Sequence, residues 1–164
     1  MNWLTIKGWL TEREGLALRE LARDADVLEL GAYCGRSTVC LASVAREVVT
    51  VDTFDAEDGG TFLEFLANVN AAGVRNVTFL VSDVGSLDFN PFAGRFDLVF
   101  VDTFHDAGAV ERDTAVALRC VKPGGVVAWH DYGDPNWPDV AAVLGRLGLV
   151  PDAVVDRLAW RKIA

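Results

Sequence analysis

Cysteine and basic residues are scarce in this sequence, and each shortage excludes a class of function. The three cysteines, Cys34, Cys40 and Cys120, form no C-x-x-C pair, which disfavours a zinc ribbon or a disulfide framework and predicts reduced, mostly buried thiols. The 15 Lys and Arg residues are outnumbered by 24 Asp and Glu, giving a net charge of −9. Because an acidic surface repels phosphate backbones, nucleic acid is not expected as a partner.

Long apolar runs are also missing. No stretch approaches the roughly 18 apolar residues of a transmembrane helix, and the N-terminal residues lack a signal-peptide pattern. Together with the unpaired cysteines, this predicts a cytoplasmic protein without a membrane partner. The 164 residues, of which 51% are hydrophobic, suffice for one globular core. We expect a single domain over 1–164, with an N-terminal lid and helix segment at 1–24 and a core at 25–164.

A buried strand, a glycine turn and a helix start follow one another at residues 27–38. Gly31 and Gly35 allow backbone conformations and close approaches that a Cβ would block. Ser37 or Thr38 is expected to cap the helix. At the carboxyl end of a parallel strand, such a turn forms a crevice whose backbone N–H groups suit an anionic ligand group.

The glycine spacing helps to identify the ligand. Dinucleotide folds use G-x-G-x-x-G, whereas Tyr33 stands here where the close-approach glycine would be, which disfavours NAD. Asp52 ends the second predicted strand, 21 residues after Gly31. Nucleoside-binding folds present a carboxylate to the ribose hydroxyls at about this distance. The pattern therefore predicts a nucleoside cofactor other than NAD.

Strand and helix patterns alternate along the chain, which is typical of an α/β fold. Two capping boxes, Thr11 with Glu14 and Thr61 with Glu64, are expected to begin helices. The expected strands are 27–30, 48–51, 77–81, 96–101, 126–129, 149–155 and 157–163, and the expected helices after the first are 37–44, 61–72, 107–119 and 139–147. A turn is expected at 122–125.

Both histidines of the chain stand beside acidic residues at the ends of two predicted strands. Asp102 ends the fourth strand, with His105 three residues later, and His130 and Asp131 end the fifth. Because the carboxyl ends of parallel strands meet at one edge of a sheet, we expect these four side chains around one crevice. Histidine is a suitable general base near neutral pH.

These motifs resemble those of class I S-adenosylmethionine-dependent methyltransferases. Residues 29–38 read Glu-Leu-Gly-Ala-Tyr-Cys-Gly-Arg-Ser-Thr, and 96–132 read strand, Asp-x-x-His, a helix with Asp113, Pro-Gly-Gly, strand, His-Asp-Tyr. They look most like small-molecule O-methyltransferases related to catechol and caffeoyl-CoA enzymes and to bacterial antibiotic- and sugar-modifying relatives. The resemblance covers 10–163. It implies a Rossmann-like, doubly wound, seven-stranded and mostly parallel sheet whose last strand pair is antiparallel.

The resemblance implies S-adenosylmethionine as cofactor and a set of residues that would bind it. Asp52 would hold the ribose hydroxyls, and Asp83 the adenine amino group with Val84 beside the ring. The full expected set is Glu29, Gly31, Ala32, Tyr33, Gly35, Ser37, Asp52, Thr53, Asp83 and Val84.

The resemblance also suggests catalytic and metal-binding roles. In the metal-dependent branch of the family, an Asp after the fourth strand and an acidic pair after the fifth bind magnesium. Asp102 and Asp131 match these positions, and His130 stands where an acid is usual. Because imidazole suits manganese or zinc better than magnesium, both the presence and the identity of an ion (Mg, Mn or Zn) stay open. His105 is the expected general base, with Asp102 beside it as the second catalytic residue.

The expected function is S-adenosylmethionine-dependent methyl transfer to a hydroxyl of a small-molecule acceptor, with the assistance of a divalent metal left open. Two alternatives stay open: a metal-independent O- or N-methyltransferase, and a cofactor-binding module whose site needs a partner or a homodimer, because the chain is short for this family. Trp3, Trp9 and Trp137 are candidate contacts in that case. The acceptor pocket is expected from 1–10, 54–61 and 132–138.

Overall fold

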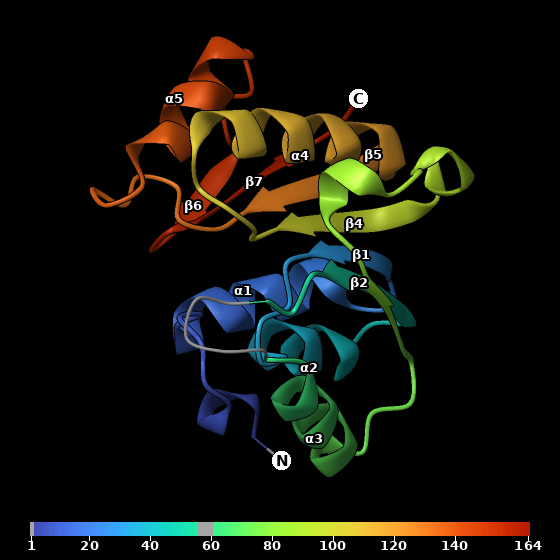
Figure 1. Ribbon diagram of the computed structural model, residues 1–164. Coiled ribbons are helices and arrows are strands. Elements are labelled where there is room, and N and C mark those ends of the chain that lie inside the picture. Colours follow the sequence, from blue (N-terminus) through green and yellow to red (C-terminus); the bar gives the residue numbers. More distant parts are fainter. Residues whose placement is uncertain (1, 56–60) are drawn as a thin grey trace.

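A computed structural model describes residues 2–55 and 61–164, and its elements form three layers (Figure 1). In chain order they are η1 (Trp3–Thr5), α1 (Glu12–Ala22), β1 (Asp26–Leu30), α2 (Arg36–Ala42), β2 (Glu47–Asp52), α3 (Phe62–Ala72), β3 (Val77–Val81), η2 (Val84–Ser86), η3 (Asn90–Phe92), β4 (Phe96–Val101), α4 (Ala107–Cys120), β5 (Val121–Trp129), α5 (Pro138–Arg146), β6 (Ala153–Val155) and β7 (Leu158–Lys162). Helices α4 and α5 cover one face of the sheet, and α1, α2 and α3 cover the other.

The sheet has seven strands in the order β3-β2-β1-β4-β5-β7-β6. Strands β1 to β5 are parallel, and β7 runs antiparallel between β5 and β6. This confirms the Rossmann-like sheet with an antiparallel last pair. The strand order reverses between β1 and β4, and the carboxyl ends on either side of such a switch point form the ligand crevice of open α/β sheets.

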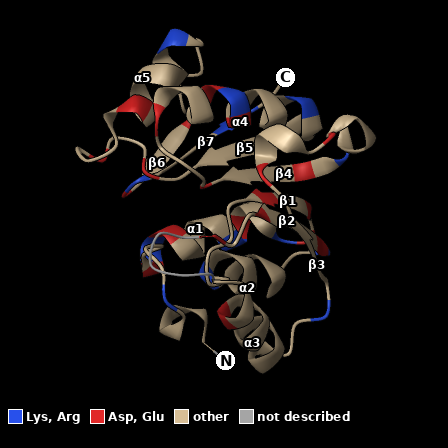
Figure 2. Cartoon of the chain, in the orientation of Figure 1, with Lys and Arg blue, Asp and Glu red and all other residues tan. Residues whose placement is uncertain are grey.

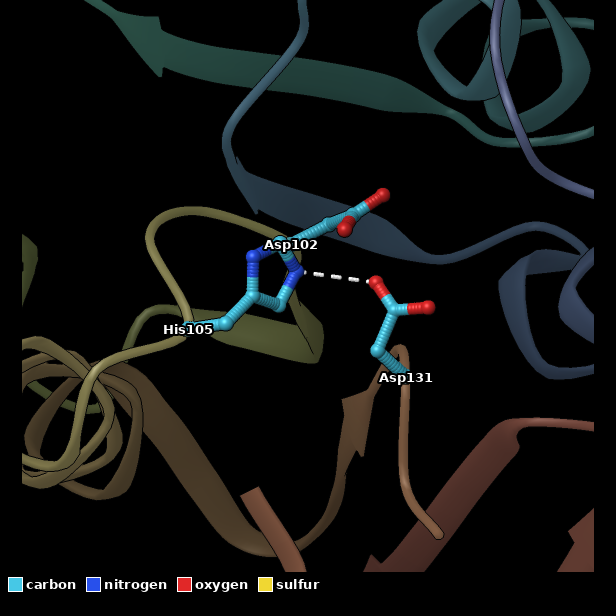
Figure 3. Close-up of side chains that lie close together, drawn as sticks. All are labelled: Asp102, His105 and Asp131. Atoms are coloured by element: carbon cyan, nitrogen blue, oxygen red, sulfur yellow. Dashed lines mark hydrogen bonds and ion pairs between the residues drawn. The ribbon is translucent and has the colours of Figure 1, made fainter. Parts of the chain in front are cut away.

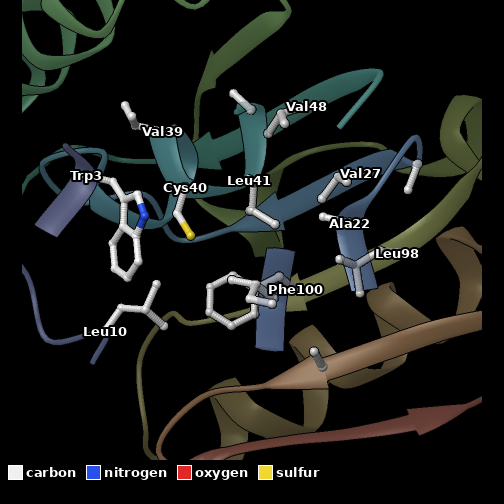
Figure 4. Packing of buried hydrophobic residues seen from close by; sticks show 14 of the residues in the cluster. Trp3, Leu10, Ala22, Val27, Val39, Cys40, Leu41, Val48, Leu98 and Phe100 are labelled. Carbon is white, nitrogen blue, oxygen red and sulfur yellow. The ribbon is translucent and has the colours of Figure 1, made fainter. Parts of the chain in front are cut away.

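The central strands are almost wholly apolar because both of their faces are covered. On β1, Val27 packs with Leu41 of α2 and belongs to the cluster on the side of α1 and α2 (Figure 4). Leu28 and Leu30, on the same strand, belong to a second cluster that includes Ala117 of α4. Burial on both sides fixes the register of the central strands and therefore the positions of their carboxyl ends.

Two of the expected helix starts differ in the structure. The capping box of Thr11 and Glu14 is confirmed, with both reciprocal hydrogen bonds present. Thr61 makes no such bond, because its backbone already has helical angles at the N-cap, so the second capping box is wrong. Helix α2 begins at Arg36 after Gly35, which is left-handed with φ 88°. Ser37 and Thr38 are therefore both inside the helix, and neither is its cap.

The boundaries of two strands in the C-terminal part also differ from the expected ones. Residues 122–125, expected to form a turn, belong to β5, which begins directly after α4. The backbone N–H of Gly124 donates to the carbonyl of Ile163, and the N–H of Ile163 donates to that of Gly125, so this segment pairs with the end of the chain. The strand expected at 149–155 shortens to β6.

The basic residues of the surface do not gather on one element. Figure 2 shows them spread over separate elements. Within the described part of the chain, no helix is both long and apolar enough to cross a membrane. The expected pocket segment 54–61 lies largely outside the described residues, since 56–60 are not among them.

Gly31→Ala is expected to lower the free energy of unfolding by more than about 3 kcal/mol, because the new Cβ would meet backbone. An ideal Cβ at this position lies 1.9 Å from the carbonyl oxygen of Asp102, and φ is 93°. Gly94→Ala is the control, since φ is 61° and no described atom lies within 4 Å of its Cβ. Left-handed strain alone should cost it about 1 kcal/mol. Equal losses in urea unfolding would contradict the close approach of Gly31 to Asp102.

Candidate active site

A cavity of about 400 Å³ opens at the carboxyl ends of the parallel strands, and most of the expected site residues line it. From the expected cofactor set these are Gly31, Ala32, Tyr33, Ser37, Asp52, Thr53, Asp83 and Val84, and from the expected catalytic and metal sets they are Asp102, His105, His130 and Asp131. The structure therefore brings together residues from the ends of five strands.

Glu29 and Gly35, also expected to bind the cofactor, lie outside the cavity lining. Glu29 is fully buried beneath the turn, where the Thr38 hydroxyl donates a 2.5 Å hydrogen bond to Oε2. The backbone N–H of Gly35 donates to the carbonyl of Ala32 at 2.8 Å. Both residues support the glycine turn without lining the cavity.

Asp52 holds the glycine turn together. Its Oδ2 accepts the backbone N–H groups of Ala32 at 2.6 Å and Tyr33 at 2.8 Å, and its Oδ1 accepts that of Phe54 at 2.6 Å. Tyr33 has φ 48°, a left-handed conformation that these bonds stabilise. A carboxylate has about four acceptor sites, so a ribose hydroxyl has to share this carboxylate with the turn. The sequence spacing located Asp52 but did not indicate this second role.

The N-terminal segment forms one wall of the cavity through Lys7, Gly8, Trp9 and Leu10. At one side, Arg36 of α2 donates to the carbonyls of Ile6 at 3.2 Å and Gly8 at 3.1 Å. At the other, Arg157, in the turn between β6 and β7, donates to the carbonyl of Trp9 at 3.3 Å. Neither arginine was expected to shape the site, because these contacts join residues far apart in the chain.

Aromatic side chains gather around the cavity. The Trp137 ring stacks on the imidazole of His105, with centroids 4.5 Å apart and an interplanar angle of 22°. The rings of Trp9 and Tyr33 lie 5.1 Å apart. Phe104 lines the cavity and is 63% exposed. Trp3, in contrast, is buried, which removes it from the candidate partner contacts.

His105 and Asp131 form a close pair at the cavity wall (Figure 3). The His105 Nε2 lies 2.8 Å from the Asp131 Oδ2, and Arg157 donates to the other oxygen, Oδ1, at 3.2 Å. Burial raises the pKa of Asp131, but the hydrogen bonds from His105 and His130 outweigh it and lower the pKa well below its usual range. Asp131 is therefore an ionised acceptor that orients the His105 ring.

His130 lies between carboxylates on both sides and is only 3% exposed. Its Nδ1 lies 3.1 Å from the Asp131 Oδ2 and 3.4 Å from the Asp102 Oδ1, and its Nε2 lies 3.2 Å from the Glu14 Oε2. Burial lowers the pKa of His130, but these carboxylates raise it to about 12. Sequence reasoning missed Glu14, because its capping box explained the residue without a second role.

The metal set expected from the sequence, Asp102, His130 and Asp131, does not fit an ion well. Each ring nitrogen of His130 faces a carboxylate of the chain, and a ring that donates to both sides offers no lone pair to an ion. Among the described residues, Asp102, His105 and Asp131 each offer one ligand atom within 4.8 Å of the others. However, Oδ2 of Asp131 accepts from both histidines and Oδ1 accepts from Arg157, which leaves about one acceptor site of this carboxylate for an ion.

One comparison with known proteins shows the family of this chain. A family model described as a methyltransferase domain matches residues 28–132. Phosphoethanolamine N-methyltransferase 1 from Triticum aestivum is 29% identical over 129 residues, covering 74% of this chain and 25% of that protein, so the chain spans a quarter of this relative's length.

Solved structures show the same fold. The O-methyltransferase TomG from Streptomyces achromogenes, in complex with SAM, has a TM-score of 0.71 and 22% identity, covering 95% of this chain and 82% of TomG. Cofactor-bound Rv0187 from MTB has a TM-score of 0.72 and 24% identity, covering 94% of this chain and 81% of that one. At such identities these likenesses concern the fold alone.

Glu29→Gln is expected to remove a pH-dependent loss of stability. Burial raises the pKa of Glu29 from 4.5 to about 7, although the hydroxyls of Ser37, Thr38 and Thr50 lower it in part. Between these pH values the native state keeps a proton that the unfolded chain releases, so stability falls as pH rises through this window, by about 3 kcal/mol in all. Gln cannot ionise.

Urea unfolding near pH 5 and pH 8 measures the difference. The free energy of unfolding of Glu29→Gln relative to the native protein should increase with pH, whereas that of the exposed Glu12→Gln control should stay flat. A pH-independent difference for Glu29→Gln would show that Glu29 is not protonated in the fold.

Proposed function

The chain belongs to the methyltransferase domain family, the S-adenosylmethionine-dependent enzymes of class I, and we propose that it transfers the cofactor's methyl group to a hydroxyl of a small molecule. The observation that carries the choice of a hydroxyl is the His105–Asp131 pair at the wall of the cavity. A hydroxyl must lose a proton as it attacks, and a histidine oriented by a carboxylate can accept that proton.

The glycine turn and two acids support the placement of the cofactor. Gly31 brings backbone without a side chain to the cavity, and Asp52 supplies acceptor oxygens for the ribose hydroxyls. Oδ1 of Asp83 accepts the backbone N–H of Gly85 at 2.7 Å, and we assign its Oδ2 to the adenine amino group. Val84 lies beside it in the lining, where it can pack against the ring.

The proposed transfer is a single displacement. The hydrogen bond to Asp131 assigns the Nε2 proton to His105, which leaves the Nδ1 lone pair to take the proton of the acceptor hydroxyl. The acceptor oxygen forms a bond to the methyl carbon as the bond from carbon to the sulfonium sulfur breaks. The electron pair stays on sulfur, S-adenosylhomocysteine leaves, and the proton remains on His105. Holding both reactants in one cavity supplies much of the rate.

Transfer to nitrogen is the second candidate, because the matched Triticum protein is by name an N-methyltransferase. The choice of a small acceptor rests on the cavity, whose aromatic side chains Trp9, Phe104 and Trp137 suit a ring or sugar face. A homodimer stays a prediction, with Trp9 and Trp137 as exposed candidate contacts.

Asp52→Asn is expected to weaken S-adenosylhomocysteine binding by about 1–3 kcal/mol, because one charged acceptor is lost. Calorimetric titration of the full chain measures this, with Asp88→Asn as the control. Asp88 is an exposed acid outside the cavity lining, so its variant has the same charge change and should bind like the native protein. Unchanged affinity of Asp52→Asn would remove Asp52 from the cofactor site, and no binding by the native protein would overturn the proposed function.

His105→Gln is expected to lower kcat by about 100- to 10,000-fold, because the general base is lost. The affinity for S-adenosylhomocysteine should stay within about twofold, since His105 serves the acceptor side. Transfer of a labelled methyl group to a panel of phenols and sugars supplies the assay. Trp137→Phe keeps an aromatic ring against His105 and should keep most of the activity. Full turnover by His105→Gln would exclude it as the base.

A further inference from the structure

We propose that His130, held between Glu14 on one side and Asp102 and Asp131 on the other, is a fixed cation that takes the place of a divalent ion in the transfer site, with Glu14 as its positioning residue. This inference rests on the proposed function. It makes the transfer independent of an added metal and gives the N-terminal helix a part in the chemistry.

Glu14 contacts two residues of the cavity lining, His130 and Arg157. It is fully buried, and its Oε2 accepts the backbone N–H of Thr11 at 2.7 Å besides facing the His130 Nε2. Its Oε1 accepts the backbone N–H of Arg157 at 2.9 Å. Although burial raises the pKa of Glu14, these hydrogen bonds lower it to about 2, so the residue is a buried anion. A buried anion needs a buried cation, and His130 supplies it.

The other side of His130 meets the two carboxylates at which the resemblance places a metal ion. Asp102 and Asp131 share its Nδ1, at 3.4 and 3.1 Å. Arg157 adds a second fixed cation, because it contacts Asp131 at 3.2 Å and Asp134 at 2.9 Å. An ion placed between Asp102 and Asp131 would lie against the N–H of His130. Asp102 and Asp131 therefore each already face a cation of the chain itself.

The arrangement connects helix α1 to the general base through side chains alone. Glu14 contacts His130, His130 contacts Asp131, and the same Asp131 oxygen, Oδ2, accepts from His105. If Glu14 loses its charge, the charge-assisted bond to one N–H group of His130 weakens, and Oδ2 of Asp131 loses a fixed donor while Oδ1 keeps Arg157. His105 then loses its orientation although no residue of the cavity wall has changed.

Two measurements on the full chain test this proposal without an acceptor. The first is electron paramagnetic resonance of Mn²⁺ mixed with the protein, with and without S-adenosylhomocysteine, where the native protein is expected to leave the free-ion signal unchanged. The second is the ¹⁵N spectrum of the imidazole rings at neutral pH. With two histidines in the chain, His130→Asn assigns both rings. The His130 ring is expected to carry protons on both nitrogens, and the His105 ring a hydrogen-bonded proton on Nε2.

Variants of α1 give the matched comparison. Glu14→Gln is expected to change the ring signals of His130 and to remove the hydrogen-bonded Nε2 proton of His105, while the affinity for S-adenosylhomocysteine stays within about twofold. Thr11→Ala removes the hydroxyl that caps the same helix but keeps the backbone N–H that Glu14 accepts, so it should lower stability and leave both rings unchanged. Ring signals that move equally in both variants would overturn the positioning role.

The Mn²⁺ measurement distinguishes failure of this inference from failure of the proposed function. Uptake of one Mn²⁺ by the native protein, lost in His130→Asn, would show that His130 is a ligand and overturn the fixed cation. Binding of S-adenosylhomocysteine that requires Mn²⁺ would do the same and keep the methyltransferase. A doubly protonated His130 ring in a protein that binds no S-adenosylhomocysteine would support the fixed cation and reject the proposed function. His130→Asp, which replaces the cation by a third carboxylate, is expected to gain Mn²⁺ binding.

Discussion

The contact on which the site depends is the one between the glycine turn and the end of β4. The N–H of Asp102 donates to the carbonyl of Leu30, the N–H of Gly31 donates to that of Val51, and Gly31 lies so close to the Asp102 carbonyl that no side chain fits between them. This closeness sets the cofactor turn beside the strand end that carries Asp102 and His105. The glycine turn and the end of β4, which are far apart in the chain, therefore line the same cavity.

Negative and positive side chains alternate along one side of this cavity. The chain is strongly acidic overall, and several of its carboxylates converge at the strand ends, which alone would destabilise the fold. Glu14, His130, Asp131 and Arg157 instead follow one another as anion, cation, anion and cation in direct contact. Because buried charges are tolerated when each has a partner, these contacts allow Glu14 and Asp131 to stay ionised although both are buried. Order at the general base is thus a property of the whole network.

Features that depend on local sequence could be predicted, and features that depend on distant contacts could not. The strands and the glycine turn follow from apolar runs and from Gly31, and Asp52 and Asp102 follow from their places at strand ends. Thr61 fits the capping pattern but fails to cap because its backbone angles are already helical. The contact between Glu14 and His130 joins residues 116 positions apart, so no local pattern could indicate it. The place of His130 at the end of β5 suggested a metal ligand, but the carboxylates around its ring do not suit that role.

The packing of residues 6–10 against Arg36 and Arg157 has a consequence for the order in which the protein is built. One wall of the cavity comes from the first residues of the chain, and its outer anchor, the contact of Arg157 with Trp9, joins residues 148 positions apart. Loops of this length close late, because their entropy is lost before their contacts form. We therefore expect this wall of the cavity to form late in folding, when the hairpin of β6 and β7 docks.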